Sequence, residues 1–164
     1  MPNYFYLDAS ALAKRYAPEP GSLVVDHLFS RLSPQRMFVL HLGVAEVVSI
    51  LVRKYNAQRL SFSDFSQAFA NVGTEIINQS ALRKPAASAK FINASLALIS
   101  KHSINATDAV LLRSALDMAA GLRASGDDLV LVASDWRLLR AGQTEGLQVF
   151  NPEKQTTTDL DLLV

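Results

Sequence analysis

The chain has 164 residues, 49% of them apolar, and carries 16 Lys and Arg against 15 Asp and Glu, a formal net charge of +1. This length and apolar content suit one compact domain with a sizeable core. The sequence contains no cysteine, which excludes a disulfide framework, thiolate-bound zinc and a cysteine nucleophile. Any metal must therefore be held by oxygen or histidine ligands.

Membrane and secretory signals are missing from the sequence. No apolar run reaches the roughly 18 residues that a membrane span needs. The first ten residues, MPNYFYLDAS, lack the basic region and cleavage site of a secretory signal. We therefore expect a soluble, cytoplasmic protein without a membrane partner.

The same order of strand, acid and helix occurs near both ends of the chain. Residues 3–7 (NYFYL) are predicted to form a strand that ends at Asp8, and the helix formers ASALAKRYA follow. Residues 129–133 (LVLVA) form a second apolar run, which Asp135 and the helical stretch WRLLRAG follow. Uninterrupted apolar runs separated by helices indicate parallel strands that are covered on both faces.

The spacing of apolar residues predicts the elements between these two ends. In chain order they are a helix over 22–32, a strand over 37–41, helices over 44–55, 63–77, 85–102 and 105–120, a loop over 121–128 and a last strand over 147–150. A weakly marked strand over 76–82 is a further option. The sequence thus predicts a single α/β domain over residues 1–152, with a parallel sheet of four or five strands and about six helices. Residues 153–164 are predicted to be a polar, peripheral tail.

Two acids are predicted to lie at the carboxyl ends of strands, where open parallel sheets bind their ligands. Asp8 follows an almost wholly apolar strand, so its charge is costly there unless it is paired, capped or bound to a metal. Capping of the next helix explains Asp8 about as well as a functional role does. The same alternative applies to Asp135, which the positive end of its helix would also stabilise.

Two further acids are predicted to lie in apolar helices. Glu46 is surrounded in sequence by Val and Ile residues, and its alternative explanation is a narrow polar stripe with Ser49 and Arg53. Asp108 is near the start of its helix, where acids are common because of the helix dipole.

Four clustered carboxylates would raise one another's pKa unless a cation neutralised them, and such oxygen ligands suit Mg²⁺ or Mn²⁺. Without these four acids, sixteen basic residues face eleven acids, a balance that suits a polyanion bound around a metal.

Six segments together resemble the PIN-domain ribonucleases, and more narrowly the VapC toxins of bacterial toxin–antitoxin pairs. They are YLDASALAKRY, PEPGS, VAEVVSIL, ATDAVLL, LVASDWRL and GLQVFNP, in the order and approximate spacing of the family, and the resemblance covers residues 3–152. The resemblance implies a three-layer α/β/α domain with metal-binding or catalytic roles for Asp8, Glu46, Asp108 and Asp135. It also implies supporting polar contacts from Ser10 and Ser134.

The implied activity is metal-dependent endoribonuclease cleavage, in which the four acids hold one or two Mg²⁺ ions. The resemblance further implies single-stranded or looped RNA as substrate, a cognate antitoxin that covers the crevice, and a homodimer. Four basic residues are candidates for phosphate contacts, although each is also explained as an ordinary solvated charge: Lys14, Arg15, Arg53 and Lys54. The three histidines, His27, His41 and His102, match no ligand position of the family, and we interpret them as structural.

Two other functions remain open at the level of sequence. In phosphatases that phosphorylate an Asp after the first strand, a second acid often follows two residues later, but here that position is Ser10. A catalytically idle PIN-like domain that only binds RNA or protein is the other alternative. Intact acids argue against that alternative.

Overall fold

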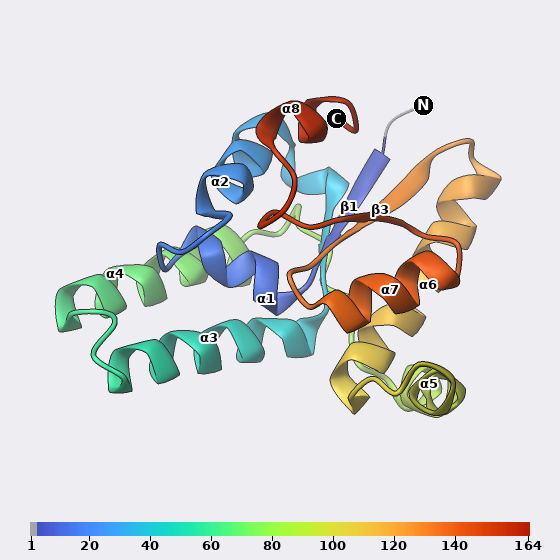
Figure 1. The fold of residues 1–164 in the computed structure, drawn as a ribbon, viewed down its shortest axis with the longest axis horizontal. Helices are drawn as coiled ribbons and strands as arrows, with labels where there is room; N and C mark the ends of the chain where they lie inside the picture. Colours follow the sequence, from blue (N-terminus) through green and yellow to red (C-terminus); the bar gives the residue numbers. More distant parts are fainter. Residues whose placement is uncertain (1–2) are drawn as a thin grey trace.

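The computed structural model describes residues 3–164, which form an α/β fold around one parallel sheet (Figure 1). The four strands are β1 (Asn3–Leu7), β2 (Met37–Val39), β3 (Asp128–Val132) and β4 (Gln148–Phe150). Their order in the sheet is β2-β1-β3-β4, and every neighbouring pair is parallel. The central strands β1 and β3 pair from Asn3 with Asp128 to Leu7 with Val132, so their carboxyl ends lie level.

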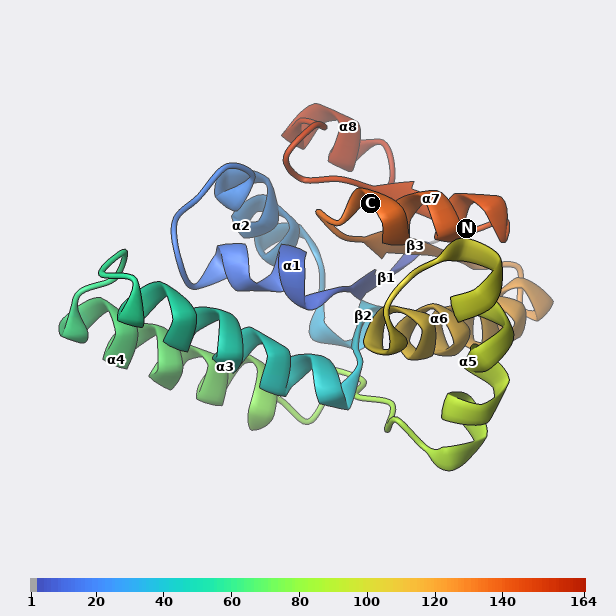
Figure 2. The same cartoon turned by 60° about the horizontal axis from the view of Figure 1, so that its bottom comes forward.

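Helices cover both faces of the sheet and give the three-layer arrangement that the sequence predicts (Figure 2). They are α1 (Ala9–Leu12), α2 (Ser22–Arg31), α3 (His41–Asn56), α4 (Phe62–Val72), α5 (Ala89–His102), α6 (Ala106–Ala124), α7 (Trp136–Thr144) and α8 (Thr157–Asp161). Along β1, Phe5 and Leu7 pack in the core with α1 to α4 and α8, whereas Tyr6 packs in a second core with α5, α6 and α7. Because both faces are buried, these strands are continuous apolar runs rather than alternating ones. Within residues 3–164, none of the helices combines the length and the apolar character that crossing a membrane requires.

The sheet has four strands because the weakly marked strand over 76–82 does not form. Ile76 lies instead in a π-helical turn, Gly73–Ile77, that extends α4. The chain reaches the edge of the sheet only afterwards, where Arg83 makes an isolated parallel bridge with Phe38 of β2. That part of the prediction was wrong, since buried Ile76 and Leu82 belong to turns that pack on the core rather than to a strand.

Other parts of the chain also differ from the sequence-based prediction. The strand predicted over 37–41 ends at Val39, because His41 begins α3. The first half of the loop predicted over 121–128 is helix, because α6 continues to Ala124. Leu122 packs on the core, which offsets the roughly 1 kcal/mol cost of Gly121 in a helix. At the start of α5, residues 85–88 are not helical, and the Ser88 side chain caps the helix. The segment 153–164 is not peripheral: it forms α8, which packs against α2 and buries Leu160 completely.

Candidate functional site

Asp8 lies immediately after β1, at the carboxyl edge of the sheet. Its backbone N–H donates to the carbonyl of Val132 at 2.9 Å, and its side chain is 6% exposed. One carboxylate oxygen, Oδ2, accepts hydrogen bonds from the backbone N–H of Ser10 at 3.0 Å and from the Ser10 hydroxyl. Asp8 therefore caps α1, as its alternative explanation predicted. Burial nevertheless raises the pKa of Asp8, the charge of Asp135 raises it further, and the hydrogen bonds from Ser10 and Ala9 only oppose these effects.

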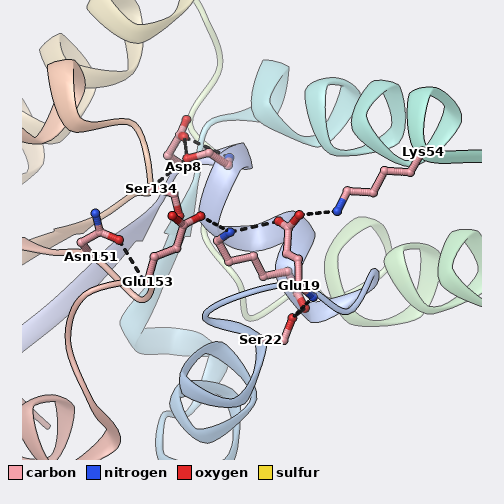
Figure 3. Close-up of polar contacts among 9 residues, drawn as sticks. Asp8, Glu19, Ser22, Lys54, Ser134, Asn151 and Glu153 are labelled. Carbon is pink, nitrogen blue, oxygen red and sulfur yellow. Dashed lines mark hydrogen bonds and ion pairs between the residues drawn. The ribbon is translucent and has the colours of Figure 1, made fainter. Parts of the chain in front are cut away.

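The two serines predicted to support the site, Ser10 and Ser134, meet beside Asp8. Figure 3 shows Ser134 next to Asp8. The backbone N–H of Ser134 donates to the Ser10 Oγ at 3.0 Å, and the Ser10 hydroxyl in turn donates to Asp8. The Ser134 Oγ is buried and has no hydrogen-bond partner within residues 3–164. The ends of β1 and β3 are thus tied together, and one buried hydroxyl next to them has an unused hydrogen-bonding capacity.

The structure brings the four predicted acids to one pocket. Glu46 comes from α3, Asp108 from the first turn of α6, and Asp135 from the N-cap of α7. With Asp8 they line a pocket of about 370 Å³, together with Ala9, Ser10, Ser49, Ile50 and Arg53. Asp135 is also a true cap, because its Oδ1 accepts from the backbone N–H groups of Arg137 and Leu138 at 2.7 and 3.4 Å. Capping and a place in this pocket are therefore compatible at both strand-end acids.

Repulsion among these carboxylates shows in their proton affinities. Burial raises the pKa of Glu46, and the charge of Asp8 adds to the rise, while a hydrogen bond with Thr107 opposes it. The pKa of Asp108 rises from 3.8 to about 7, first because of burial and then because of the charges of Asp8, Asp135 and Glu46. Without a counterion, the Asp108 carboxyl therefore keeps its proton at pH values where an ordinary surface carboxylate is already ionised.

The chemistry of these donors fits a hard divalent cation, since carboxylate and hydroxyl oxygens are the ligands of Mg²⁺ and Mn²⁺. The unpartnered Ser134 Oγ adds another oxygen beside the pocket. As the side chains stand, however, no three His, Asp or Glu side chains among residues 3–164 are grouped closely enough to hold an ion. A cation at this pocket would therefore require the acids to turn toward it from their separate elements.

Two of the four basic candidates are engaged in an ion-pair chain and do not line the pocket. Figure 3 shows Glu153, Glu19 and Lys54 of this chain. Lys14 is 3% exposed, and its Nζ lies 3.0 Å from Glu19 and 2.6 Å from Glu153. Lys54 pairs with the other carboxylate oxygen of Glu19. Burial favours a higher pKa for Glu19, but the hydrogen bonds from Lys54 and Lys14 lower it overall. Lys14 and Lys54 therefore connect separate segments of the fold through ion pairs, and they do not line the acidic pocket.

The other two basic candidates differ from each other. Arg15 pairs with Asp26 at 2.8 Å and with Glu75 at 3.0 Å, and it too is absent from the pocket. Arg53 does line the pocket, on the exposed side of α3. Of the four candidates, only Arg53 is thus placed to meet a phosphate at the acids.

The histidines lie outside the acidic pocket, and two of them contact carboxylates. His27 Nε2 is 2.9 Å from Asp161, and His102 Nε2 is 2.6 Å from Glu145. Arg137 was not among the residues predicted from the sequence, and its positive charge opposes the rise in the pKa of Asp108. Its position two residues after Asp135 was the available signal.

No protein-family profile and no curated protein sequence matches the chain. Solved structures with a similar fold include FitAB bound to an IR36 DNA fragment, with 15% identity, a TM-score of 0.66, and coverage of 93% of this chain and 97% of that one. FitAcB from Neisseria gonorrhoeae has 16% identity and a TM-score of 0.63, covering 92% and 99%. PAE2754 from Pyrobaculum aerophilum has 21% identity and a TM-score of 0.62, covering 99% and 98%. At such identities the likeness concerns the fold, and it is consistent with the PIN-like fold that the motifs predict.

Proposed function

We propose that the protein is a metal-dependent endoribonuclease whose active site is the pocket of Asp8, Glu46, Asp108 and Asp135. One observation carries the proposal: four carboxylates from four different elements line a single pocket at the carboxyl edge of the sheet. Two alternative explanations, capping by Asp8 and by Asp135, do not account for Glu46 and Asp108 being there as well. The pKa values of three of these acids are raised, which means that their ionised forms are destabilised in the pocket. A bound cation would relieve this destabilisation.

Phosphodiester cleavage needs an attacking oxygen, neutralisation of the phosphate charge and a path for protons. When bound, Mg²⁺ or Mn²⁺ neutralises phosphate charge and acidifies a water molecule. The Ser10 hydrogen bonds hold the Asp8 carboxylate in one orientation. In the metal-free protein the pKa of Asp108 is about 7, and a bound cation would lower this pKa and keep Asp108 ionised as a ligand. Arg53 at the rim is placed for a phosphate oxygen, and this scheme uses no protein nucleophile.

The substrate that we propose is single-stranded or looped RNA, because such RNA presents accessible phosphates to a pocket. We further propose that the protein is the toxin of a toxin–antitoxin pair, that it acts as a homodimer, and that a cognate antitoxin covers the acidic pocket. The motifs shared with VapC toxins support this role. The similar fold of FitAB, which was solved bound to a DNA fragment, also supports an association with nucleic acid.

Two alternatives make different predictions. In the aspartyl phosphatase alternative, Asp8 would be the nucleophile, yet Ser10 occupies the place of the usual second acid and its hydroxyl bonds to Asp8. In the idle-domain alternative, the protein would bind RNA without cutting it.

An assay of RNA cleavage beside an assay of phosphatase activity separates the three functions. A labelled RNA with stem-loops is incubated with the protein in Mg²⁺, in Mn²⁺ and in EDTA, and p-nitrophenyl phosphate is tested in parallel. The proposal predicts internal cleavage with either metal, no cleavage in EDTA and no phosphatase activity. Cleavage that persists in EDTA, or phosphatase activity without cleavage, would contradict the proposal. Binding without cleavage under every condition would favour the idle domain.

A further inference from the structure

A second and larger pocket lies at α7, the helix whose N-cap Asp135 lines the acidic pocket. Its volume is about 650 Å³, and it opens to solvent between the end of α5 and α7. Its lining includes Lys101, His102, Trp136, Arg137 and Arg140. We call it the Trp136 pocket.

Trp136 is the single tryptophan of the chain, and its side chain is 65% exposed. It follows Asp135 directly, so the acidic pocket and the Trp136 pocket have adjacent residues in their walls. The guanidinium of Arg140, one helical turn further along α7, lies 5.6 Å from the centroid of the indole ring. An indole held near an arginine in this way offers an aromatic surface for a planar group while a cation stands beside it.

The charge of the Trp136 pocket is positive. Arg137 and Arg140 form no ion pair with a carboxylate in the part of the chain that the structure describes, residues 3–164. Lys101 and His102 share one carboxylate, that of Glu145, at 2.7 and 2.6 Å. Three permanent cations therefore face one acid, and the two arginines are available to an external anion.

The two pockets are also linked electrostatically, because Arg137 lines the Trp136 pocket and its charge acts on Asp108 in the acidic one. A chain of phosphates that reached the acids would thus find cations and an aromatic ring in the next pocket. Single-stranded nucleic acid offers this combination of groups, since its bases stack on aromatic side chains while its backbone follows cations.

We infer that the Trp136 pocket is a subsite for a nucleotide of the RNA strand that neighbours the cleaved phosphate. In this subsite a base stacks on Trp136, and Arg137 and Arg140 contact backbone phosphates. The inference rests on the proposed function for the identity of the strand. An acidic protein segment would use the same cations, but it would have no base to stack on the indole.

Binding measured without metal tests the subsite independently of cleavage. In EDTA, a fluorescein-labelled decamer of single-stranded RNA is titrated with protein and followed by anisotropy, and the unlabelled decamer is followed by tryptophan fluorescence. Because Trp136 is the only tryptophan, quenching reports on this pocket alone. We expect quenching at the concentrations where anisotropy rises. Trp136→Leu should weaken binding about tenfold or more, whereas Trp136→Phe, which keeps an aromatic face, should retain most of the affinity.

The contribution of the Arg140 charge to RNA binding is tested by Arg140→Gln. Lys90→Gln, at an exposed position of α5 outside the pocket, is the matched control. Arg140→Gln should weaken binding and reduce the salt dependence of log Kd by about 0.7. Lys90→Gln should change neither. Melting curves of each variant check that the fold is intact, which the exposure of both side chains favours.

Several results would overturn the subsite. They are the absence of RNA binding by the intact protein, an unchanged affinity of Trp136→Leu, and equal quenching by poly-L-glutamate, which would favour an acidic protein partner. A different result would contradict the proposed nuclease function: RNA would bind and quench the tryptophan fluorescence but would not be cut when Mg²⁺ or Mn²⁺ is added. Normal cleavage together with unchanged binding by Trp136→Leu would remove the subsite and leave the nuclease proposal standing.

Discussion

The backbone N–H of Ser134 donates a hydrogen bond of 3.0 Å to the hydroxyl oxygen of Ser10, across 124 positions of sequence. The same hydroxyl donates to Asp8. A single side chain therefore joins the carboxyl ends of β1 and β3 and fixes the most buried acid of the pocket. Ser10 is a positioning residue in this account, since it acts through Asp8.

Replacing Ser10 by alanine should weaken both the fold and the site. The Ser134 N–H would lose its acceptor in a part-buried position, which costs about 1 to 3 kcal/mol of the free energy of unfolding. We expect a melting temperature several degrees lower and slower RNA cleavage. Ser49→Ala is the matched control, because Ser49 lines the same pocket but donates to Ala45 within its own helix. Equal effects of the two substitutions, or no recovery in Ser10→Thr, would contradict the role given to the Ser10 hydroxyl.

Replacing Lys14 should lower the free energy of unfolding. In Lys14→Met the carboxylates of Glu19 and Glu153 would keep their partly buried places without the cation between them. Both carboxylates retain some solvent, so we expect a loss of about 1 to 3 kcal/mol, below the full cost of breaking a buried pair. Chemical denaturation of Lys14→Met and of Lys90→Met, an exposed control, measures the difference. If Lys14 were an RNA contact instead, binding would fall while stability stayed unchanged.

The raised pKa of Asp108 predicts a pH dependence of stability in the metal-free protein. Its pKa is about 7 when folded against 3.8 as the ordinary value, so the folded state binds the extra proton between these limits. The free energy of unfolding should therefore decline as pH rises from about 4 to 7. In EDTA, Asp108→Asn should decline less over this range, and Mg²⁺ should counteract the decline in the intact protein. Melting curves with the same pH slope for both proteins would show that Asp108 is not the cause.

The strands and the acids were predictable because their signals are local. The runs NYFYL and LVLVA are apolar throughout since both faces of the sheet are covered, and Asp8 and Asp135 follow them directly. The burial of Lys14 was not predictable, because Glu153 is 139 positions away in sequence. The Trp136 pocket was missed for the same reason, since it exists only where the end of α5 meets α7. The short helix α8 escaped notice because its buried face amounts to Leu160 among polar neighbours.

A growth test examines the proposed toxin role. An unrestrained ribonuclease should arrest the cell that makes it, so induced expression in a bacterial host without an antitoxin should stop growth. Asp8→Asn, expressed to the same level, should leave growth close to normal. Equal growth of the two strains at matched protein levels would count against the toxin role, even if the purified protein cuts RNA.

The most direct measurement is the rate at which one labelled RNA is cut in Mn²⁺ by the intact protein and by five variants. Four of them change the pocket: Asp8→Asn, Glu46→Gln, Asp108→Asn and Asp135→Asn. The fifth, Asp127→Asn, is the control, because Asp127 precedes β3 at the opposite end of that strand. We predict that each pocket variant folds and that its metal-dependent rate falls by about 100-fold or more, which corresponds to a loss of about 2.7 kcal/mol of transition-state stabilisation. The control should keep the rate of the intact protein. Full activity in two of the four pocket variants would contradict the account of this pocket as a metal-dependent nuclease site.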